Sequence, residues 1–148
     1  MRSRQVAILT VILSTVIGAC ERGKVEAGSS ESRSRPPEPT LAVKDVDLGR
    51  TINADKSLAG HADDFRPKET IYVSVATVGT ASGTLKARWT GPSGAVIDET
   101  NEHISPKGPE HTEFHISRPA GFALGKYRVV VFLNDNQVGS KDFEIKRK

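Results

Sequence analysis

The sequence has a single cysteine among its 148 residues, and this residue, Cys20, lies close to the start of the chain. One thiol cannot form a disulfide within the chain, so a disulfide framework is excluded even in an oxidising compartment. The folded part of the protein must therefore be stabilised by its apolar core. About 108 residues follow position 40, which is enough for one isolated domain.

The sequence also lacks an apolar run long enough to span a bilayer. Residues 6–17 ("VAILTVILSTVI") form an uncharged, mostly apolar run of 12 residues, whereas a membrane-spanning helix needs roughly 20. Arg2 and Arg4 precede this run and give the chain a positive start. A basic start followed by about 7–15 apolar residues is typical of a secretory signal peptide.

The end of this run resembles a bacterial lipobox, in which an aliphatic residue and two small residues precede a cysteine. The matching residues are Ile17, Gly18, Ala19 and Cys20. The resemblance implies that signal peptidase II recognises the first three and removes residues 1–19, and that Cys20 carries a diacylglyceryl group and an acylated amine. The alternatives are an ordinary signal peptide or a short uncleaved anchor with an incidental cysteine. The positive start, run length, small residues and cysteine together favour the lipoprotein.

A triacylated Cys20 would be a lasting membrane anchor, because one acyl chain anchors a protein marginally whereas two or more hold it firmly. The residue after it is Glu21. In many Gram-negative bacteria an aspartate at this position retains a lipoprotein in the inner membrane. Its absence favours the outer membrane, with the domain facing the periplasm.

Neither sign of charge dominates the sequence, which has 21 Lys and Arg residues against 18 Asp and Glu. Removal of residues 1–19 takes Arg2 and Arg4 with it and lowers the formal charge from +3 to about +1. A nearly neutral chain offers no electrostatic basis for binding nucleic acid. The basic ending, residues 146–148 ("KRK"), predicts a solvated tip in preference to a contact with anionic lipid.

Residues 20–40 form the predicted tether. After the cysteine, residues 21–40 ("ERGKVEAGSSESRSRPPEPT") have almost no large apolar side chains and balance four basic residues with four acidic ones. Such a segment cannot bury enough apolar surface to offset its ordering entropy. As a flexible coil it would reach roughly 25 Å root-mean-square, which lifts the domain, residues 41–148, clear of the lipid headgroups.

From residue 41 onward, apolar residues alternate with polar ones, and many are β-branched or aromatic. This period of two predicts half-buried strands. About seven strands are expected, at residues 42–48, 70–78, 84–90, 95–99, 112–117, 126–133 and 138–146. "GPSG" (residues 91–94) and "NDNQ" (residues 134–137) predict tight turns between them. No segment shows convincing helical periodicity, although residues 54–65 could hold one helical turn.

Seven short strands without helices predict an all-β, antiparallel β-sandwich. The pattern resembles immunoglobulin-like and fibronectin-type-III-like domains, with Trp89 in the middle of the third strand and residues 125–145 as the closing hairpin. The cysteine pair of antibody-type domains is absent. "FRPKETIYVSV", "GTLKARWT" and the closing hairpin also resemble pieces of small, uncharacterised bacterial lipoproteins. That resemblance covers residues 65–145 and implies a fold and a location but no known activity.

Two groups of residues invite a metal site, and neither satisfies the geometry of one. His111 and His115 lie on one predicted strand, where a rise of about 3.3 Å per residue separates them by roughly 13 Å. They cannot share one Zn²⁺ at about 2 Å per ligand. His61, Asp63 and Asp64 supply too few oxygens for Ca²⁺, which takes about 6–8. No metal and no cofactor is therefore expected.

A hydrolytic site is not expected either. His103 and Ser105 could be two members of a hydrolase triad, but the sequence shows no nucleophile elbow and no third partner. We therefore predict no catalytic residue and a protein that is not an enzyme.

Three aromatic residues are candidates for ligand binding. Phe122 lies in a predicted loop, where it either binds a ligand or caps the core. Tyr72 falls on the outward phase of its strand. Trp89 either fills the core or stacks on a ligand, as on many sugar-binding sandwiches, and its shared phase with Leu85 and Ala87 favours the core.

These features predict a non-catalytic binding or assembly module that is held at the membrane through Cys20. The expected partner is an envelope protein or an envelope polysaccharide. The alternative is a hydrolytic or metal-dependent envelope enzyme.

The lipid prediction can be tested by metabolic labelling. Labelled palmitate should enter the wild-type protein and be absent from Cys20→Ser, because the substitution removes the thiol that accepts the diacylglyceryl group. Equal labelling of the two proteins would show that this thiol carries no lipid.

Overall fold

The computed structural model describes residue 38 and residues 40–147. The predicted signal peptide, Cys20 and nearly all of the predicted tether lie outside the described residues. Within them the chain forms strands only: β1 (Leu41–Gly49), β2 (Asp64–Phe65), β3 (Ile71–Gly79), β4 (Gly83–Thr90), β5 (Val96–Ile104), β6 (Glu110–Ile116), β7 (Gly125–Leu133) and β8 (Asn136–Ile145). This described part has no helix that is long and apolar enough to cross a bilayer.

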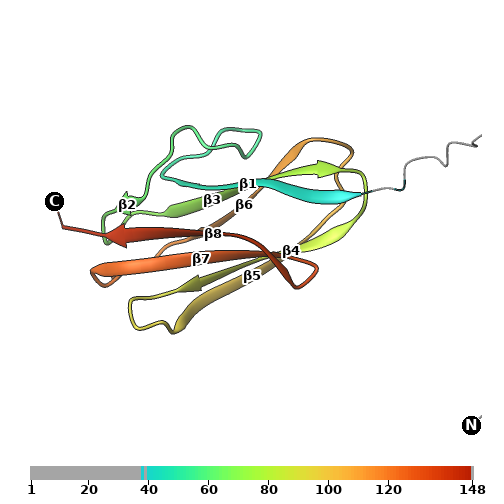
Figure 1. The fold of residues 1–148 in the computed structure, drawn as a ribbon. Helices are drawn as coiled ribbons and strands as arrows, with labels where there is room; N and C mark the ends of the chain where they lie inside the picture. Colours follow the sequence, from blue (N-terminus) through green and yellow to red (C-terminus); the bar gives the residue numbers. More distant parts are fainter. Residues whose placement is uncertain (1–37, 39, 148) are drawn as a thin grey trace, which may run out of the picture. The chain divides into compact units, whose positions relative to one another are not determined.

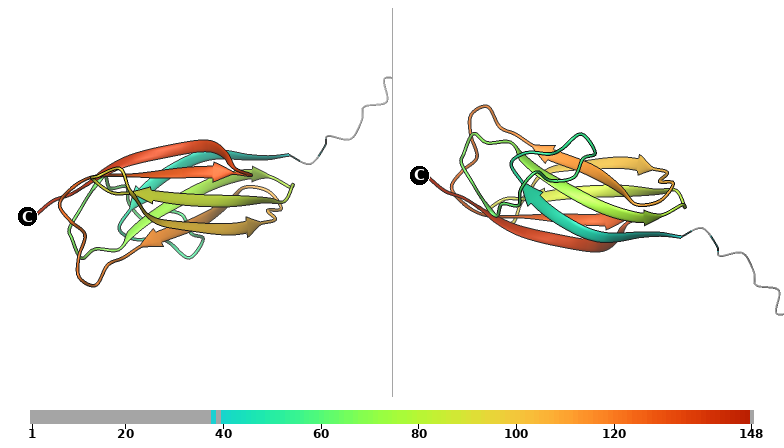
Figure 2. Two further views of the ribbon diagram at one scale, coloured as in Figure 1. Left: turned by 90° about the horizontal axis from the view of Figure 1, so that it is seen from below. Right: turned by 90° about the horizontal axis from the view of Figure 1, so that it is seen from above.

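The strands form two sheets that pack face to face (Figures 1 and 2). One sheet has three strands in the order β1-β3-β6, and the other has five in the order β2-β8-β7-β4-β5. All pairs are antiparallel except the two-residue pair of β2 with β8. The predicted all-β antiparallel sandwich is therefore confirmed.

Three local predictions need correction. β5 continues to Ile104, whereas its end was expected at Glu99; the strand is exposed on both sides over most of its length, so its sequence shows no alternation. β2 was missed because two residues are too few to show a period. The helical turn expected within residues 54–65 is wrong. This segment is an irregular loop, held to the end of β1 by a hydrogen bond from the Ala62 amide to the Leu48 carbonyl at 2.9 Å.

The core lies between the two sheets and is centred on aromatic rings. Trp89 is fully buried, and its ring packs edge-on against Phe143 at 6.0 Å between centroids. Phe143 also contacts Tyr127 at 5.3 Å and Phe65 at 5.7 Å. Trp89 therefore fills the core, as its phase predicted, and cannot stack on an external ligand.

Phe122 also belongs to the core, although it lies in a loop. Its side chain is only 5% exposed, and its ring meets that of Tyr127 edge-on at 6.0 Å. It caps the core beneath the loop that follows β6, so the alternative of an exposed binding residue is excluded. Among the described residues, the buried apolar side chains run from Val46 to Ile145.

The β7–β8 hairpin contains a register shift that decides which side chains of β8 face inward. Its two-residue turn has positive φ angles at Asn134 (49°) and Asp135 (65°), as a type I′ turn requires. Phe132 pairs with Gln137, but Val131 pairs with Gly139, so one residue of β8 is left unpaired as a bulge. The extra residue shifts the alternation of β8 by one, so that beyond the bulge the odd-numbered residues face the core. Phe143 is one of them.

The sandwich is closed along one side, where β1 of the small sheet approaches β8 of the large one. A side chain at Gly139 would come within 2.8 Å of Val46, so only glycine fits this approach. Asp47 and Lys141 form an ion pair at 2.8 Å across the same seam. The other side is more open, because β5 pairs with β4 alone.

The role of Trp89 gives a quantitative prediction. Trp89→Ala should lower the free energy of unfolding by about 3–5 kcal/mol, because it removes a fully buried ring from a packed core. Denaturant titration measures this loss. Arg88→Ala, which removes a surface ion pair from the same strand, should change it by about 1 kcal/mol or less. Equal effects of the two substitutions would contradict the packing described above.

Candidate functional site

A broad, open groove lies on the outer face of the five-stranded sheet. It lies where β4 and β8 end and β7 begins, and has a volume of about 550 Å³. Side chains alternate along each strand, so every second residue of these three strands lies on this outer face. Its charged lining residues are Asp63, Lys126, Arg128, Asp142, Glu144 and Lys146.

Two ion pairs lie in the groove, and one of them crosses from β7 to β8. Arg128 donates two hydrogen bonds to the Asp142 carboxylate, at 2.6 and 3.0 Å. These bonds hold the pKa of Asp142 below its ordinary value and raise that of Arg128. Lys146 pairs with Glu144 at 3.4 Å, whereas Lys126 has no ion-pair partner among the described residues. The groove therefore presents both signs of charge, and its Lys126 and Asp63 belong to no ion pair among the described residues.

An aromatic ledge continues this face beyond the groove. Phe132 points outward from β7 and is half-buried by two cations, with the Arg88 guanidinium 5.1 Å and the Lys86 ammonium 5.8 Å from its ring centre. Each cation also has a carboxylate partner: Glu99 lies 2.5 Å from Arg88, and Asp135 lies 2.7 Å from Lys86. The ledge is therefore a flat surface of ring and fixed charge rather than a pocket.

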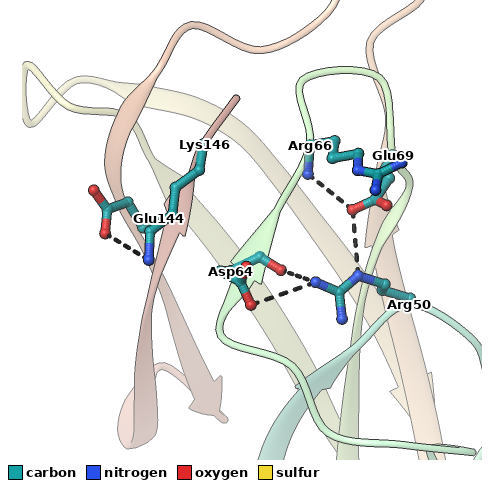
Figure 3. A network of polar contacts seen from close by, with 6 residues as sticks. All are labelled: Arg50, Asp64, Arg66, Glu69, Glu144 and Lys146. Atoms are coloured by element: carbon teal, nitrogen blue, oxygen red, sulfur yellow. Dashed lines mark hydrogen bonds and ion pairs between the residues drawn. The ribbon is translucent and has the colours of Figure 1, made fainter. Parts of the chain in front are cut away.

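A second network fixes the segment that borders the groove (Figure 3). Arg50 donates to the backbone carbonyl of Asp64 and lies 3.3 Å from the Glu69 carboxylate. Glu69 also accepts a hydrogen bond from the Arg66 amide at 2.8 Å. The Arg50 guanidinium covers the Phe65 ring at 5.3 Å. Arg50 thus ties β2 and the turn after it to the end of β1.

The structure does not bring the predicted metal candidates together. His111 bonds to Ser74 at 3.1 Å, whereas His115 lies 3.2 Å from Glu113 and beside the Tyr72 ring. Tyr72 therefore lies on the outer face of the three-stranded sheet. The described residues hold no group of three or more His, Cys, Asp or Glu residues that could bind one metal ion.

The remaining candidates are also dispersed. His61 lies 3.4 Å from Asp47, and Asp64 interacts with Arg50. Asp63 instead lines the groove. Asp63 and His61 also border a smaller hollow, but neither shares a contact with Asp64.

His103 and Ser105, the pair weighed above for a hydrolase, are not joined by a hydrogen bond. Ser105 bonds to Ser82 at 2.8 Å, and His103 makes no hydrogen bond to it. One Ser–His contact of the described part, Ser74 with His111, was not predicted. Ser74 is 5% exposed and its hydroxyl donates to the Lys56 carbonyl at 2.8 Å, so this pair fastens the loop over the small sheet.

The groove was not predicted, because the alternation of residues does not reveal the register in which β7 pairs with β8. Arg128 and Asp142 stand in segments that were correctly predicted as neighbouring strands. Counting back from the turn without a bulge would place Arg128 opposite Lys141, a like charge. The bulge moves Asp142 into that position.

Comparison with solved structures identifies the fold as immunoglobulin-like. An immunoglobulin-like protein from Pseudomonas aeruginosa is 12% identical, with a TM-score of 0.50 over 72% of this chain and 97% of that one. A Pseudomonas fluorescens alkylpurine DNA glycosylase (16% identity) and a Listeria innocua β-glucosidase (9%) each give a TM-score of 0.48 and cover 72% and 73% of this chain. This chain spans only 30% and 16% of those two chains, and neither likeness bears on its activity.

The sequence matches no known protein family and no curated protein. The comparisons thus support the fold and leave the function to the chemistry of the surface.

The ion pair in the groove predicts a pH dependence. In an NMR titration, the Asp142 carboxyl should titrate below its ordinary pKa of 3.8 because Arg128 stabilises the carboxylate. Arg128→Gln should return this pKa toward 3.8. Because the pKa of Asp142 is lower in the folded than in the unfolded protein, its ionisation stabilises the fold above pH 3.8. This stabilisation is lost as the pH falls through the lower pKa of the folded state. The stability difference between wild type and Arg128→Gln should therefore shrink in acid; an unchanged Asp142 pKa in the variant would contradict the pairing.

Proposed function

We propose that this protein is a lipid-anchored binding module of the bacterial cell envelope. Cys20 holds the chain in the outer membrane, and the tether lets the immunoglobulin-like domain reach into the periplasm. The domain then binds an envelope protein or polysaccharide with the outer face of its five-stranded sheet. It acts by binding or assembly and not by catalysis.

The observation that carries this proposal is the groove with its paired charges. Its walls are strand residues with fixed backbone positions, and the Arg128–Asp142 pair is held by two hydrogen bonds. A surface whose donors and acceptors are already ordered loses less conformational entropy on binding. The adjoining Phe132 ledge adds apolar area to a charged surface, a combination that suits a protein or a hydroxyl-rich polymer.

The location rests on the N-terminal sequence. The run before Cys20 resembles a lipoprotein signal, and the segment after it has the composition of a flexible linker. A tether of this length leaves the domain free to turn its groove toward partners near the membrane.

An envelope enzyme is the weaker candidate. In the described part, the serine that contacts a histidine is Ser74, and its hydroxyl is buried and committed to the Lys56 carbonyl. A nucleophile needs its oxygen exposed to substrate and a base free to accept its proton. Neither condition holds at this pair.

Site-specific photo-crosslinking in cells tests the proposed binding face. A photoreactive amino acid at Thr90, in the groove, should give a discrete crosslinked product, whereas one at Ala59, in the exposed loop beside the small sheet, should not. Arg128→Glu should abolish the product at Thr90 because it places two carboxylates together in the groove. Lys44→Glu, an equal change of charge outside the groove, should leave the product intact. Crosslinks of equal strength from both positions, or a product that survives Arg128→Glu, would overturn the assignment.

A further inference from the structure

A second surface lies at the end of the sandwich where the described chain finishes. It consists of the β2–β3 turn (residues 66–70), the β4–β5 turn (91–95), the β6–β7 loop (117–124) and residues 146–147. We call this surface the distal cap. Figures 1 and 2 show these segments at the C-terminal end, opposite the end where β1 begins.

The segments of the distal cap are joined by specific contacts. The Phe122 amide donates to the Pro67 carbonyl at 2.7 Å, and the Lys146 amide donates to the Phe65 carbonyl at 2.9 Å. Gly125 lies so close to Pro92 that a side chain there would approach its ring to 3.0 Å. The cap is therefore one continuous surface with fixed spacing between its loops.

The distal cap is strongly basic. Its cations are Arg66, Lys68, Arg118, Lys146 and Arg147, and its single carboxylate is Glu69. Glu69 is already bonded to Arg50. These cations are all exposed. Lys146 pairs with Glu144, and the other four have no ion-pair partner among the described residues.

This charge is local to the cap and does not reflect the whole domain. The described residues contain fourteen Lys and Arg side chains against fifteen Asp and Glu, so the domain as a whole is nearly neutral. Unneutralised cations gathered at one end repel each other, and an anionic partner would relieve that repulsion.

The cap also exposes aliphatic surface among these cations. Leu124 is 46% exposed, and Pro119, Ala120 and Ala123 in the same loop are exposed as well. The one aromatic ring of the loop, Phe122, is turned into the core with the Arg118 guanidinium above it at 5.7 Å. The cap thus offers cations and an aliphatic tip but no exposed ring for stacking on sugars.

We propose that the distal cap docks on an anionic membrane surface, with its cations on lipid phosphates and Leu124 in the interfacial layer. Basic residues draw a protein to anionic headgroups, and an adjacent apolar side chain adds burial at the headgroup boundary. The cap shares only Gly91 and Lys146 with the proposed groove, and the variants below alter neither residue, so the two assignments can fail separately. Each cation near the surface should strengthen binding about fivefold.

Vesicle co-sedimentation tests the proposal. The protein is the whole chain from residue 20 with Cys20→Ser, so that no acyl chain contributes to binding. Vesicles of equal phosphatidylglycerol and phosphatidylethanolamine should bind it, whereas phosphatidylcholine vesicles should not. Raising the salt should release it, because screening shortens the reach of surface charges.

Charge reversals locate the binding surface. The pair Lys68→Glu and Arg118→Glu should weaken vesicle binding at least about twentyfold, which follows from about fivefold per lost cation. A second pair, Arg66→Glu and Arg147→Glu, removes no contact with an aromatic ring and should weaken vesicle binding by the same factor. It therefore tests the surface even if the first pair unfolds the domain. The control pair, Lys44→Glu and Lys107→Glu, changes the net charge equally away from the cap and should bind as wild type.

Leu124→Ser distinguishes a lipid surface from another polyanion, since it should weaken vesicle binding roughly fivefold at unchanged charge. The proposal would be overturned if the protein bound neutral vesicles equally well, or if the control pair lost as much binding as the cap pairs. It would also be overturned if Leu124→Ser or the cap variants kept full binding. So would failure to bind vesicles combined with retention on dextran sulfate, which would assign the cap to a polysaccharide.

Discussion

The inward position of Phe143 is the constraint on which both faces of the large sheet depend. Its ring contacts Trp89, Tyr127 and Phe65, and so joins β8 to β4, β7 and β2. A domain with no disulfide relies on such packing. Phe143 can face inward only because β8 carries a bulge after its turn, and the same bulge sets Asp142 outward beside Arg128. Core packing and groove electrostatics are therefore two results of one register.

The sequence predicted the features that depend on local patterns. Alternation identified the long strands other than β5, the "NDNQ" segment identified the hairpin turn, and the phase of Trp89 assigned it to the core. What alternation cannot reveal is where one period slips, because a bulge changes pairing without changing composition. The groove was missed for this reason. The cap was missed because its cations are far apart in sequence and meet only where two loops and residues 146–147 reach the same end.

The edges of the two sheets carry features that discourage pairing with a further strand. Asp45 and Asp98 each accept a hydrogen bond from the next residue's amide, at 2.9 Å, so each carboxylate satisfies a donor on an edge strand. The β1–β8 side is closed by the contact of Val46 with Gly139. Edges of this kind discourage pairing with another strand. This leaves the sheet face and the loops, which carry the fixed charges, as the surfaces for the proposed binding.

The path of β1 has a mechanical consequence. The chain enters the domain at Leu41, at one end of the sandwich, and leaves at the opposite end after Ile145 (Figure 1). Tension between the N-terminal segment and the distal end would pull β1 lengthwise along β3. All eight paired positions from Leu41 to Gly49 would then bear load together, in shear, instead of opening one after another. Because forced unfolding is governed by the unfolding rate, this geometry suits a domain that must stay folded while it is pulled from both ends.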